Sequence, residues 1–372
     1  MRFIVDKEEL IKGLTMVSKA VPQKVELPIL ANIKLELNNK GLEIVGSDNN
    51  LTIRTIVPYM IGDREIIREA RPGATLIGLK IFSEVIRHLE GNDVSIELID
   101  NSILRIDDGR SNYKLNSISA DEYPEIDLNI TGAFFEVKAK DFVSLVEQTA
   151  FAASIKETRP ILTTVNLEAA SNQLTATATD TARLARKTIS IENDVRFTAN
   201  IPAKKLLDIV HSFEGDSIVS VSVSDKKALF SFDNTVIATR LTNGDYPNTK
   251  NIVPKTFNYY LEVNSRELLG AMERVSLLSA DRDGVIKLLM SEDGIEVISR
   301  SSMVGSANEK ISTYQFNGER FEISFRASFV ADAIKAVKCE DVEIAFIGEM
   351  KPFVVKNPKD DSIDMLITPL RS

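Results

Sequence analysis

The length, composition and charge of the chain limit its class before any motif is considered. Its 372 residues are enough for two or three ordinary domains, and 44% hydrophobic with 27% charged residues is the balance of a globular protein. The formal net charge of −9, from 45 basic and 54 acidic residues, argues against tight wrapping of nucleic acid over the whole surface. One basic face remains compatible with DNA, because the local field depends on where the charges lie.

The numbers of cysteine and histidine residues and the lengths of the apolar runs exclude further classes of protein. One cysteine, Cys339, allows no internal disulfide, and His88 and His211 are too few and too far apart for a metal site of nitrogen and sulfur ligands. No stretch of about eighteen apolar residues predicts a membrane span. Residues 1–10 carry acidic side chains directly behind a short apolar run, unlike a secretory signal. We therefore expect a cytoplasmic protein with no membrane partner, metal or cofactor.

In chain order, one succession of predicted elements occurs three times. Each occurrence has an apolar strand end that leads into an amphipathic helix, an alternating strand, a second amphipathic helix and another alternating strand. The first occurrence has its helix-containing segments at 3–14 and 81–93, with strands from Ile33 and Val94; the first such segment of each occurrence begins with the strand end. The second has them at 135–146 and 206–217, with strands from Val165 and Ile218. The third has them at 261–272 and 329–341, with strands from Ile286 and Val342.

The spacing of these elements indicates internal repetition. Val94, Ile218 and Val342 follow one another at intervals of 124 residues. A fixed period of this kind is typical of tandem copies of one supersecondary unit. Turn residues such as those at 38–41 and 107–109 separate the strands. The sequence therefore predicts an α+β fold with three tandem repeats of a module that has two helices and an antiparallel sheet.

Two similar segments mark the ends of the first two modules. Residues 121–126 read Asp-Glu-Tyr-Pro-Glu-Ile, and residues 244–249 read Gly-Asp-Tyr-Pro-Asn-Thr. Proline just past a strand ends the ladder of hydrogen bonds and stiffens the joint. We therefore expect three domains at 1–127, 128–253 and 254–372.

No pattern in the chain predicts catalysis. It has no GxGxxG, no phosphate-binding loop and no GxSxG elbow. SxxK occurs at 111–114 and 224–227 without its companion motifs. Thr179-Asp180 has a counterpart in Ser47-Asp48, and a repeated pair of this type is typical of a capped turn. We expect a protein that is not an enzyme.

Several motifs, in order along the whole chain, resemble those of a known family. They are Leu27-Pro-Ile-Leu-Ala-Asn32, Glu157-Thr-Arg-Pro-Ile-Leu162, Ala178-Thr-Asp-Thr-Ala-Arg-Leu-Ala185, Leu241-Thr-Asn-Gly-Asp-Tyr-Pro247 and Pro369-Leu-Arg371. With the threefold repeat, they make the chain similar to the β subunit of bacterial DNA polymerase III, the processivity clamp. The resemblance implies the DNA clamp fold and a head-to-tail homodimeric ring.

The resemblance also implies function and partners. A clamp of this family encircles duplex DNA without regard to sequence and tethers the replicative polymerase for processive synthesis. Its partners are DNA polymerase III, clamp loader subunits, other polymerases and repair proteins, which bind through short linear peptides. Two alternatives remain open: a trimeric clamp of the two-domain kind, against which three repeats in one chain argue, and a repeat-built hydrolase or scaffold unrelated to DNA.

Basic residues on the predicted helices and loops are candidates for DNA contact. The absence of tryptophan argues against base stacking on single strands and favours duplex bound through phosphates. Each lysine taken alone is more typical of an ordinary solvated surface. The helix candidates are Lys80, Lys140, Lys204, Lys205 and Arg266; the resemblance adds Lys24 and Lys156 in loops.

A pocket for partner peptides is implied by the resemblance near the C-terminus. The last residues, 367–371, are apolar almost to the chain end, where chains are usually polar. Core packing alone would explain Leu162, Leu184 and Ile367. The family pattern differs at Thr181, Ala182, Arg326 and Thr368. The expected lining is Leu162, Thr179, Arg183, Leu184, Pro247, Ile252, Phe329, Ile367, Pro369, Leu370 and Arg371.

The resemblance also implies a subunit contact. Tyr113 and Leu115 alternate as an edge strand of the first domain should. In the dimer they are expected to meet Leu277 and Leu278 on the third domain of the partner. The alternative is that Leu277 and Leu278 are internal helix residues.

Overall fold

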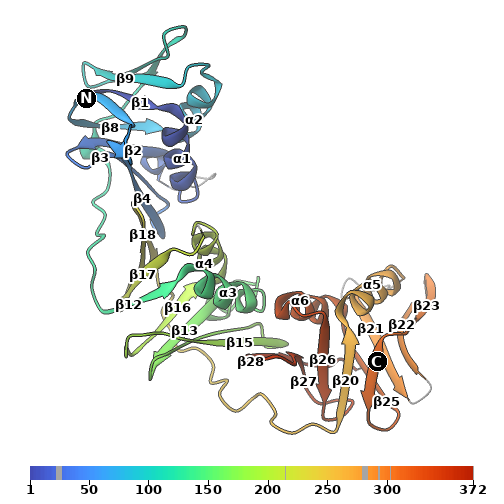
Figure 1. The fold of residues 1–372 in the computed structure, drawn as a ribbon. Helices are drawn as coiled ribbons and strands as arrows, with labels where there is room; N and C mark the ends of the chain where they lie inside the picture. Colours follow the sequence, from blue (N-terminus) through green and yellow to red (C-terminus); the bar gives the residue numbers. More distant parts are fainter. Residues whose placement is uncertain (22–26, 214, 279–283, 292–293, 302, 372) are drawn as a thin grey trace. The chain divides into compact units, whose positions relative to one another are not determined.

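The computed structural model describes residues 1–21, 27–213, 215–278, 284–291, 294–301 and 303–371. The chain divides into two compact units, residues 1–139 with 211–241, and residues 140–210 with 242–372 (Figure 1). Among the described residues, no helix has the length and apolar character needed to cross a membrane.

Two sheets and a small hairpin build the first unit. The five-stranded sheet has the order β11 (Asn112–Asn116), β10 (Ile103–Asp107), β9 (Asp93–Ile99), β1 (Arg2–Asp6), β7 (Ile67–Arg71). The eight-stranded sheet has the order β12 (Ala133–Lys138), β17 (Ile218–Val223), β18 (Lys227–Phe232), β19 (Thr235–Arg240), β4 (Leu51–Pro58), β3 (Gly41–Ser47), β2 (Asn32–Asn38), β8 (Gly73–Gly78). The hairpin pairs β5 (Met60–Ile61) with β6 (Arg64–Glu65).

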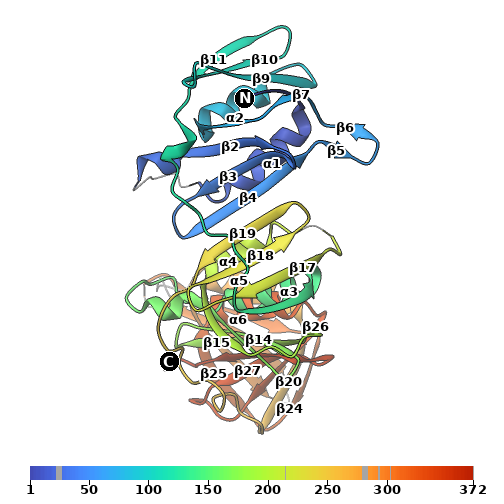
Figure 2. The ribbon, with the colours of Figure 1, turned by 90° about the vertical axis from the view of Figure 1, so that its left-hand side faces the viewer.

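The helices of the first unit lie against these sheets. They are α1 (Lys7–Ser18) and α2 (Leu79–His88), with short 3-10 helices at Pro28–Ala31 (η1) and Ala120–Glu122 (η2). The inner face of α1 buries Leu10, Gly13, Leu14 and Val17. In the eight-stranded sheet, β19 and β4 lie side by side although they are far apart in sequence (Figure 2).

The second unit is built from two sheets. The nine-stranded sheet has the order β16 (Phe197–Pro202), β13 (Thr164–Ala170), β14 (Gln173–Thr179), β15 (Arg183–Ser190), β28 (Asp360–Ile367), β27 (Phe353–Asn357), β26 (Asp341–Phe346), β20 (Tyr259–Asn264), β24 (Tyr314–Asn317). The four-stranded sheet has the order β23 (Gly305–Ile311), β22 (Gly294–Ser301), β21 (Val285–Ser291), β25 (Phe321–Arg326). The helices are α3 (Ala139–Ala150), α4 (Ala203–Val210), α5 (Ser265–Ser276) and α6 (Ala327–Val337), with a 3-10 helix at Pro160–Thr163 (η3).

The predicted helices and strands are confirmed, and the antiparallel α+β fold with them. Each of the six predicted helices is present, and the strands expected from Ile33, Val165 and Ile286 are β2, β13 and β21. The expected turn pair Ser47-Asp48 also caps a turn, because Asp48 Oδ1 accepts the backbone N–H of Asn50 at 2.9 Å and of Leu51 at 2.6 Å.

Two glycines set the distance between α1 and the sheet of the first unit. A Cβ on Gly13 would lie 2.9 Å from Ile44 Cδ1, and a Cβ on Gly46 would lie 2.5 Å from Val17 Cγ1. Neither position tolerates a side chain without a shift of its neighbour. The helix therefore approaches β3 and β4 more closely than ordinary side chains allow.

A carboxylate in the first turn of α5 ties that helix to the turn between β23 and β24. Asn264 caps the helix by accepting the N–H groups of Arg266 and Glu267. The Glu267 carboxylate accepts the backbone N–H of Ser312 at 2.7 Å, its hydroxyl at 2.7 Å and the N–H of Thr313 at 2.9 Å. These bonds, chiefly the one from the Ser312 backbone, lower the pKa of Glu267 from 4.5 to about 2.

Glu267→Gln is expected to destabilise the chain in a pH-dependent way. A folded-state pKa below the unfolded value gives stability that is fully present above pH 4.5 and is lost as the pH falls towards 2. The difference in urea midpoint between wild type and variant should therefore be largest near neutral pH and should shrink below pH 4.5. Glu319→Gln, at an exposed position, is the control. A difference that is constant over this pH range would contradict the assignment.

Candidate functional site

The pairing of β15 with β28 brings the predicted pocket residues from two parts of the chain together (Figure 1). In the antiparallel register Arg183 pairs with Ile367, and Leu184 pairs with Leu366. Successive side chains of a strand point to opposite faces of the sheet. Arg183 and Ile367 therefore lie on one face at the end of this junction, and Leu184 and Leu366 lie on the other.

A tight turn positions Arg183 at the start of β15. The Thr179 hydroxyl donates to Arg183 O at 2.6 Å and accepts the N–H of Thr181 at 3.1 Å. Asp180 Oδ1 accepts the N–H of Ala182 at 2.9 Å and of Arg183 at 3.0 Å. Thr181 has a left-handed backbone with φ of 79°. The short polar side chains of this turn hold that conformation.

The Arg183 guanidinium is held by two carboxylates and two aromatic rings. Its Nε donates to Asp180 Oδ2 at 3.1 Å, and its Nη1 donates to Asp332 Oδ2 of α6 at 2.7 Å. Its Cζ lies 4.4 Å from the ring centre of Phe329 and 5.5 Å from that of Phe151. Only 12% of the side chain is exposed. This arginine is a rigid planar group between aromatic walls.

The opposite face of the junction is apolar. Leu184 and Leu366 form a buried cluster with Ala345 and Val354. Two partly buried side chains from the connector after the second predicted module, Val253 and Phe257, cover this cluster. Ile252, which precedes them, is exposed. Val253, Phe257 and the exposed Ile252 therefore offer the apolar surface that a ligand side chain can contact at this place.

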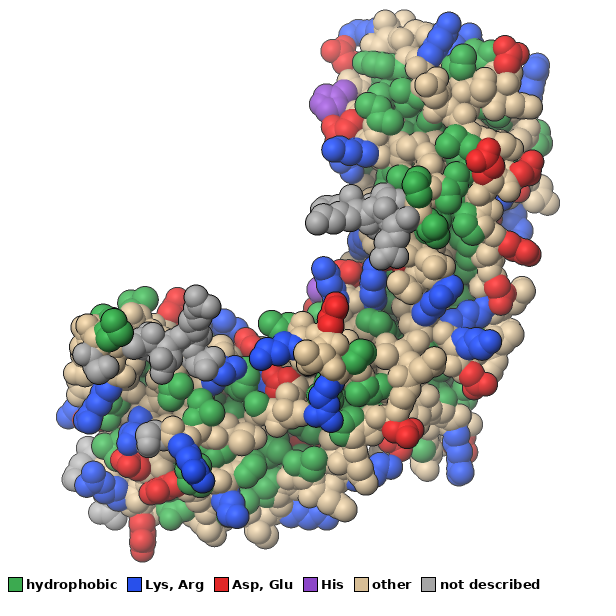
Figure 3. All heavy atoms as spheres, turned by 180° about the vertical axis from the view of Figure 1, so that it is seen from behind, with side chains coloured by type: hydrophobic (Ala, Val, Ile, Leu, Met, Phe, Trp, Pro, Cys, Tyr) green, Lys and Arg blue, Asp and Glu red, His purple; other side chains and the backbone are tan. Residues whose placement is uncertain are grey.

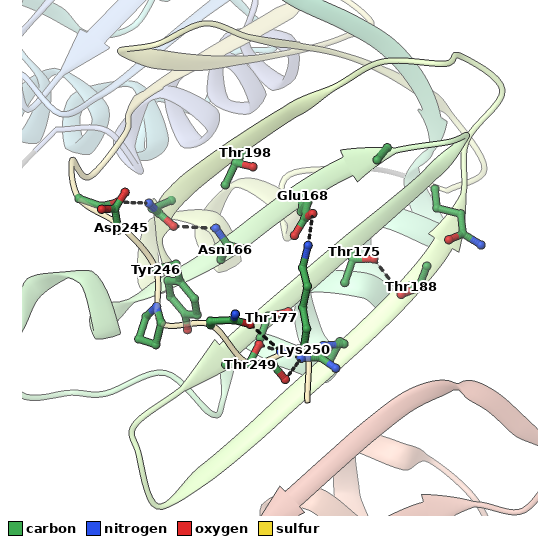
Figure 4. A pocket seen from close by; sticks show the side chains of 17 residues that line it. Asn166, Glu168, Thr175, Thr177, Thr188, Thr198, Asp245, Tyr246, Thr249 and Lys250 are labelled. Carbon is green, nitrogen blue, oxygen red and sulfur yellow. Dashed lines mark hydrogen bonds and ion pairs between the residues drawn. The ribbon is translucent and has the colours of Figure 1, made fainter. Parts of the chain in front are cut away.

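The connector also borders a polar groove of about 630 Å³, which Pro247 lines (Figure 4). Arg186 Nη2 donates to the carbonyl of Thr249 at 2.6 Å and to its hydroxyl at 2.7 Å. Lys250 forms an ion pair with Glu168 at 3.0 Å. Burial raises the pKa of Tyr246 to about 12. These contacts hold the connector on the sheet and so fix the position of Pro247.

Backbone hydrogen bonds fix the apolar chain end. The N–H of Thr368 donates to Ala182 O at 2.9 Å, and that of Leu370 donates to Ser324 O at 2.7 Å. Pro369 between them is buried, Leu370 is partly buried and Arg371 is exposed. The last residues thus continue the wall that begins at Ile367.

The other predicted pocket residues lie in different environments. Leu162 is buried in η3, where its carbonyl accepts the N–H of Ser154 at 2.8 Å. Phe329 is joined to the site through its ring contacts with Arg183 and with Arg326, whose Cζ lies 4.7 Å from the ring centre. Phe151 and Asp332 were absent from the sequence prediction, and no pattern around either residue indicates its role.

The predicted DNA-contacting residues recur at one place on the helices. Lys80, Lys140, Lys204 and Arg266 are exposed and occupy the second position of α2, α3, α4 and α5. Cations at a helix N-terminus oppose the helix dipole, typically by about 0.3–1 kcal/mol each. Helix stability therefore does not explain these four residues.

Three further basic residues complete this set. Lys205 is partly buried, Lys156 is exposed in a loop, and Lys24 lies outside the described residues. Within the described part of the chain, Lys80, Lys156, Lys204 and Arg266 take part in no ion pair. Basic and acidic side chains are interspersed on the face drawn in Figure 3.

The predicted subunit-contact residues lie at one sheet edge and one helix end. Tyr113, 39% exposed, and the partly buried Leu115 lie on β11, an edge of the five-stranded sheet. Leu277 follows α5 as its C-cap and is 79% exposed, so the alternative that it is an internal helix residue is wrong. Leu278, beside it, is partly buried.

No group of three histidine, cysteine, aspartate or glutamate side chains that could hold a metal ion occurs among the residues that the structure describes.

Comparison with known proteins identifies the class of this fold and site. Models of the N-terminal, central and C-terminal domains of the DNA polymerase III beta subunit match residues 1–127, 136–248 and 250–371. The beta sliding clamps of Bacillus subtilis and Halalkalibacterium halodurans are 32% and 33% identical over the whole of both chains. The crystal structure of the B. subtilis clamp covers 100% of this chain and 99% of that one with a TM-score of 0.96.

More distant clamps share the fold. The beta subunit of Streptococcus pyogenes is 29% identical with a TM-score of 0.95, over the whole of both chains. A sliding clamp of Pseudomonas aeruginosa, described as bound to griselimycin, is 21% identical with a TM-score of 0.93 over both chains.

These matches define a DNA polymerase processivity factor. The chain belongs to the family of the bacterial DNA polymerase III beta subunit, the beta sliding clamp. It serves polymerase processivity in DNA replication and is not an enzyme. The resemblance predicted from the sequence motifs is thereby confirmed.

Arg183→Lys is expected to lower the free energy of unfolding by about 1–2 kcal/mol. Lysine keeps the charge but loses the planar stack on Phe329 and the two-sided hydrogen bonding to Asp180 and Asp332. Urea unfolding measures the change. Arg196→Lys, at an exposed position on the connection before β16, is the matched control. Equal urea midpoints for the two variants would refute a structural role for the Arg183 contacts.

Proposed function

We propose that two copies of this chain close head to tail into a ring around duplex DNA. The observation that carries the proposal is the way in which the sheets are joined. The β19·β4 and β15·β28 pairs each link the last strand of one predicted module to a strand of the module before it. A head-to-tail contact that is repeated in this way generates a ring if the rotation closes.

The strand orders support three copies of one module, with domains at 1–127, 128–253 and 254–372. The order β8-β2-β3-β4 corresponds to β16-β13-β14-β15 and to β25-β21-β22-β23. The order β1-β9-β10-β11 corresponds to β12-β17-β18-β19 and to β20-β26-β27-β28. In this correspondence β4, β15 and β23 are equivalent, as are β11, β19 and β28.

In the part of the chain that the structure describes, two strands lack the junction that their counterparts have. β11 is an outer strand of the five-stranded sheet, and β23 is an outer strand of the four-stranded sheet. An exposed strand edge is a template for pairing with another chain. We propose that β11 of one chain pairs with β23 of its partner, which sets Tyr113 and Leu115 beside Leu277 and Leu278 of the partner.

The ring binds DNA through weak, sequence-independent phosphate contacts. A closed ring stays on DNA by topology, so a net charge of −9 is compatible with its role. The helix-start cations Lys80, Lys140, Lys204 and Arg266, with Lys205, supply positive charge towards the DNA. The loop residues Lys24 and Lys156 are proposed to contribute in the same way.

Polymerases, clamp loader subunits and repair proteins are proposed to dock short peptides at the β15·β28 junction. The apolar cluster around Leu184, with Pro247 and Ile252, would receive apolar side chains, while Arg183 and Phe329 would orient polar groups. Thr179, Leu162 and the chain end from Ile367 to Arg371 complete the wall. A clamp with the same fold, from P. aeruginosa, is described as bound to griselimycin, which supports a ligand pocket in this fold. From the replication role we also propose a cytoplasmic location.

Leu277→Asp is expected to yield a folded monomer. The side chain is 79% exposed in the single chain, so the change leaves the core intact, while a buried apolar contact in the dimer becomes an unpaired carboxylate. Loss of one central contact of about 2 kcal/mol weakens association roughly thirtyfold. Sedimentation velocity measures this, with Met350→Asp, another exposed apolar residue, as the control.

Retention on DNA tests the ring itself. Wild-type protein assembled on plasmid should remain on closed circles and leave linear DNA through its ends, and the Leu277→Asp variant should leave both. Equal loss of wild-type protein from circular and linear templates would exclude encirclement.

The triple variant Lys80→Gln, Lys204→Gln, Arg266→Gln tests the helix-start cations. If each contacts one phosphate, the slope of log affinity for short linear duplex against log salt falls by about 2 to 3. Thermal stability should stay the same or rise, because three unfavourable dipole interactions are removed. The control changes three exposed lysines outside helices, Lys40→Gln, Lys255→Gln and Lys351→Gln. An identical salt slope in the two triple variants would contradict the assignment.

A further inference from the structure

We propose that the β4·β19 junction of the first unit carries a second peptide-docking groove, which takes a short extended segment of a partner protein with an acidic residue next to an apolar one. The inference rests on the function proposed for the β15·β28 junction. It goes beyond that function because it assigns a site to residues that the proposed pocket does not use.

The turn that precedes β4 is built like the turn that precedes β15. Ser47 and Thr179 each accept a backbone N–H two residues on, from Asn49 and Thr181, at 3.1 Å in both cases. Asp48 Oδ1 accepts the next two N–H groups at 2.9 and 2.6 Å, and Asp180 Oδ1 does so at 2.9 and 3.0 Å. The φ of Asn49 is 74° and that of Thr181 is 79°.

The bonds across the two junctions also correspond. The N–H of Arg240, at the end of β19, donates to Asn50 O at 2.9 Å. The N–H of Thr368, just past β28, donates to Ala182 O at the same distance. The two junctions therefore present the same backbone frame, and only their side chains differ.

Two further features of the peptide pocket recur at the first junction. In η1 the N–H of Leu30 donates to Leu27 O at 2.9 Å, as that of Leu162 does to Arg159 O at 3.0 Å in η3. Burial raises the pKa of Tyr123 to about 12, as it does for Tyr246 in the connector of the second unit.

A groove of about 370 Å³ lies at this frame, entirely within the first unit. Its floor contains the buried Leu30 and the partly buried Ile126, which belong to one apolar cluster. Leu27 forms part of its wall and is 49% exposed, which is unusual for a leucine beside an apolar floor. These three residues can bury one apolar side chain of a bound segment.

The charges of the groove indicate which residue of the bound peptide is favoured next to its apolar side chain. Lys227 is neutralised by Asp127, with Nζ and Oδ2 2.7 Å apart. Arg240 is exposed and donates to the side-chain oxygen of Asn49 at 3.0 Å, and no carboxylate among the described residues pairs with it. The remaining carboxylate of the lining, Glu125, lies on the connector beside Pro124. An acidic side chain is therefore favoured at the Arg240 end of the groove.

The first junction lacks the aromatic clamp of the second. The position of Arg183 is taken by Leu51, which is fully buried, and that of Leu184 by Thr52. The groove thus offers one apolar subsite and one guanidinium in place of a stacked arginine and a large apolar floor. It selects a different peptide and binds it more weakly than the pocket of the second unit.

The test uses the full chain with isotope-labelled leucine and isoleucine methyl groups. The probe is acetyl-Ser-Leu-Asp-Leu-Ser-amide, titrated to millimolar concentration and followed by NMR, with the peptide that has Asn for Asp as the control. Saturable shifts are expected at Leu27, Leu30 and Ile126. Affinity at these methyls should fall about tenfold with the Asn peptide or with Arg240→Gln, the loss of one charge-assisted bond. Lys226→Gln, an exposed neighbour outside the lining, should leave it unchanged.

The outcomes separate this inference from the proposed function. Shifts confined to Leu184, Ile367 and Leu370 would overturn the second groove and leave the pocket of the second unit standing. No shift at either junction would overturn both. Equal binding of the Asp and Asn peptides would overturn the acidic preference. Leu27→Asp, a change at an exposed position, should abolish the shifts at Leu30 and Ile126 in a folded chain, and their persistence would also count against the groove.

Discussion

The constraint on which the rest of this structure depends is that strand edges must be paired. Each edge carries a row of backbone N–H and C=O groups that are costly to leave without partners. The chain satisfies two such edges by joining segments far apart in sequence, Thr55 with Thr235 and Arg183 with Ile367. At the first junction the Thr55 and Thr235 hydroxyl groups add a buried hydrogen bond of 2.8 Å. At each of these pairings a sheet continues from one module into the next. The backbone pairing therefore fixes the shape of the surface at each junction, and the side chains add its chemistry.

Much of the fold could be predicted from the sequence, because its hydrophobic residues recur at regular intervals and its elements repeat along the chain. Helix 79–88 and strand 93–99, with their later equivalents, have clear periods of 3.6 and 2 residues, and the interval of 124 residues shows that they are copies. The pairing of β19 with β4 was not predictable in this way. It joins two segments that are more than 170 residues apart. Neither the threonines in these segments nor the alternating pattern around them indicates which strand each one pairs with.

The candidate site was predictable only where motifs carry it. Thr179, Arg183 and Leu184 were found through a family motif, and the structure brings Arg183 and Leu184, at the start of β15, beside Thr179 at the end of β14. Phe151 directly follows α3 and Asp332 lies in α6, positions where an aromatic residue and an acid are ordinary. Their role comes from the meeting of α3, β15 and α6 in space, which no local pattern encodes. The bonds that Thr179 and Asp180 make within the turn explain why the departures from the family pattern at Thr181 and Ala182 leave it intact.

The bonds from Ser312 and Thr313 to Glu267 have a consequence for assembly. They anchor the far end of β23, the strand proposed to meet the partner chain, to the first turn of α5. A strand that is already held still has little conformational freedom left to lose when two subunits come together. In the proposed dimer, recognition then depends on the match between two edges that are already ordered in the single chain.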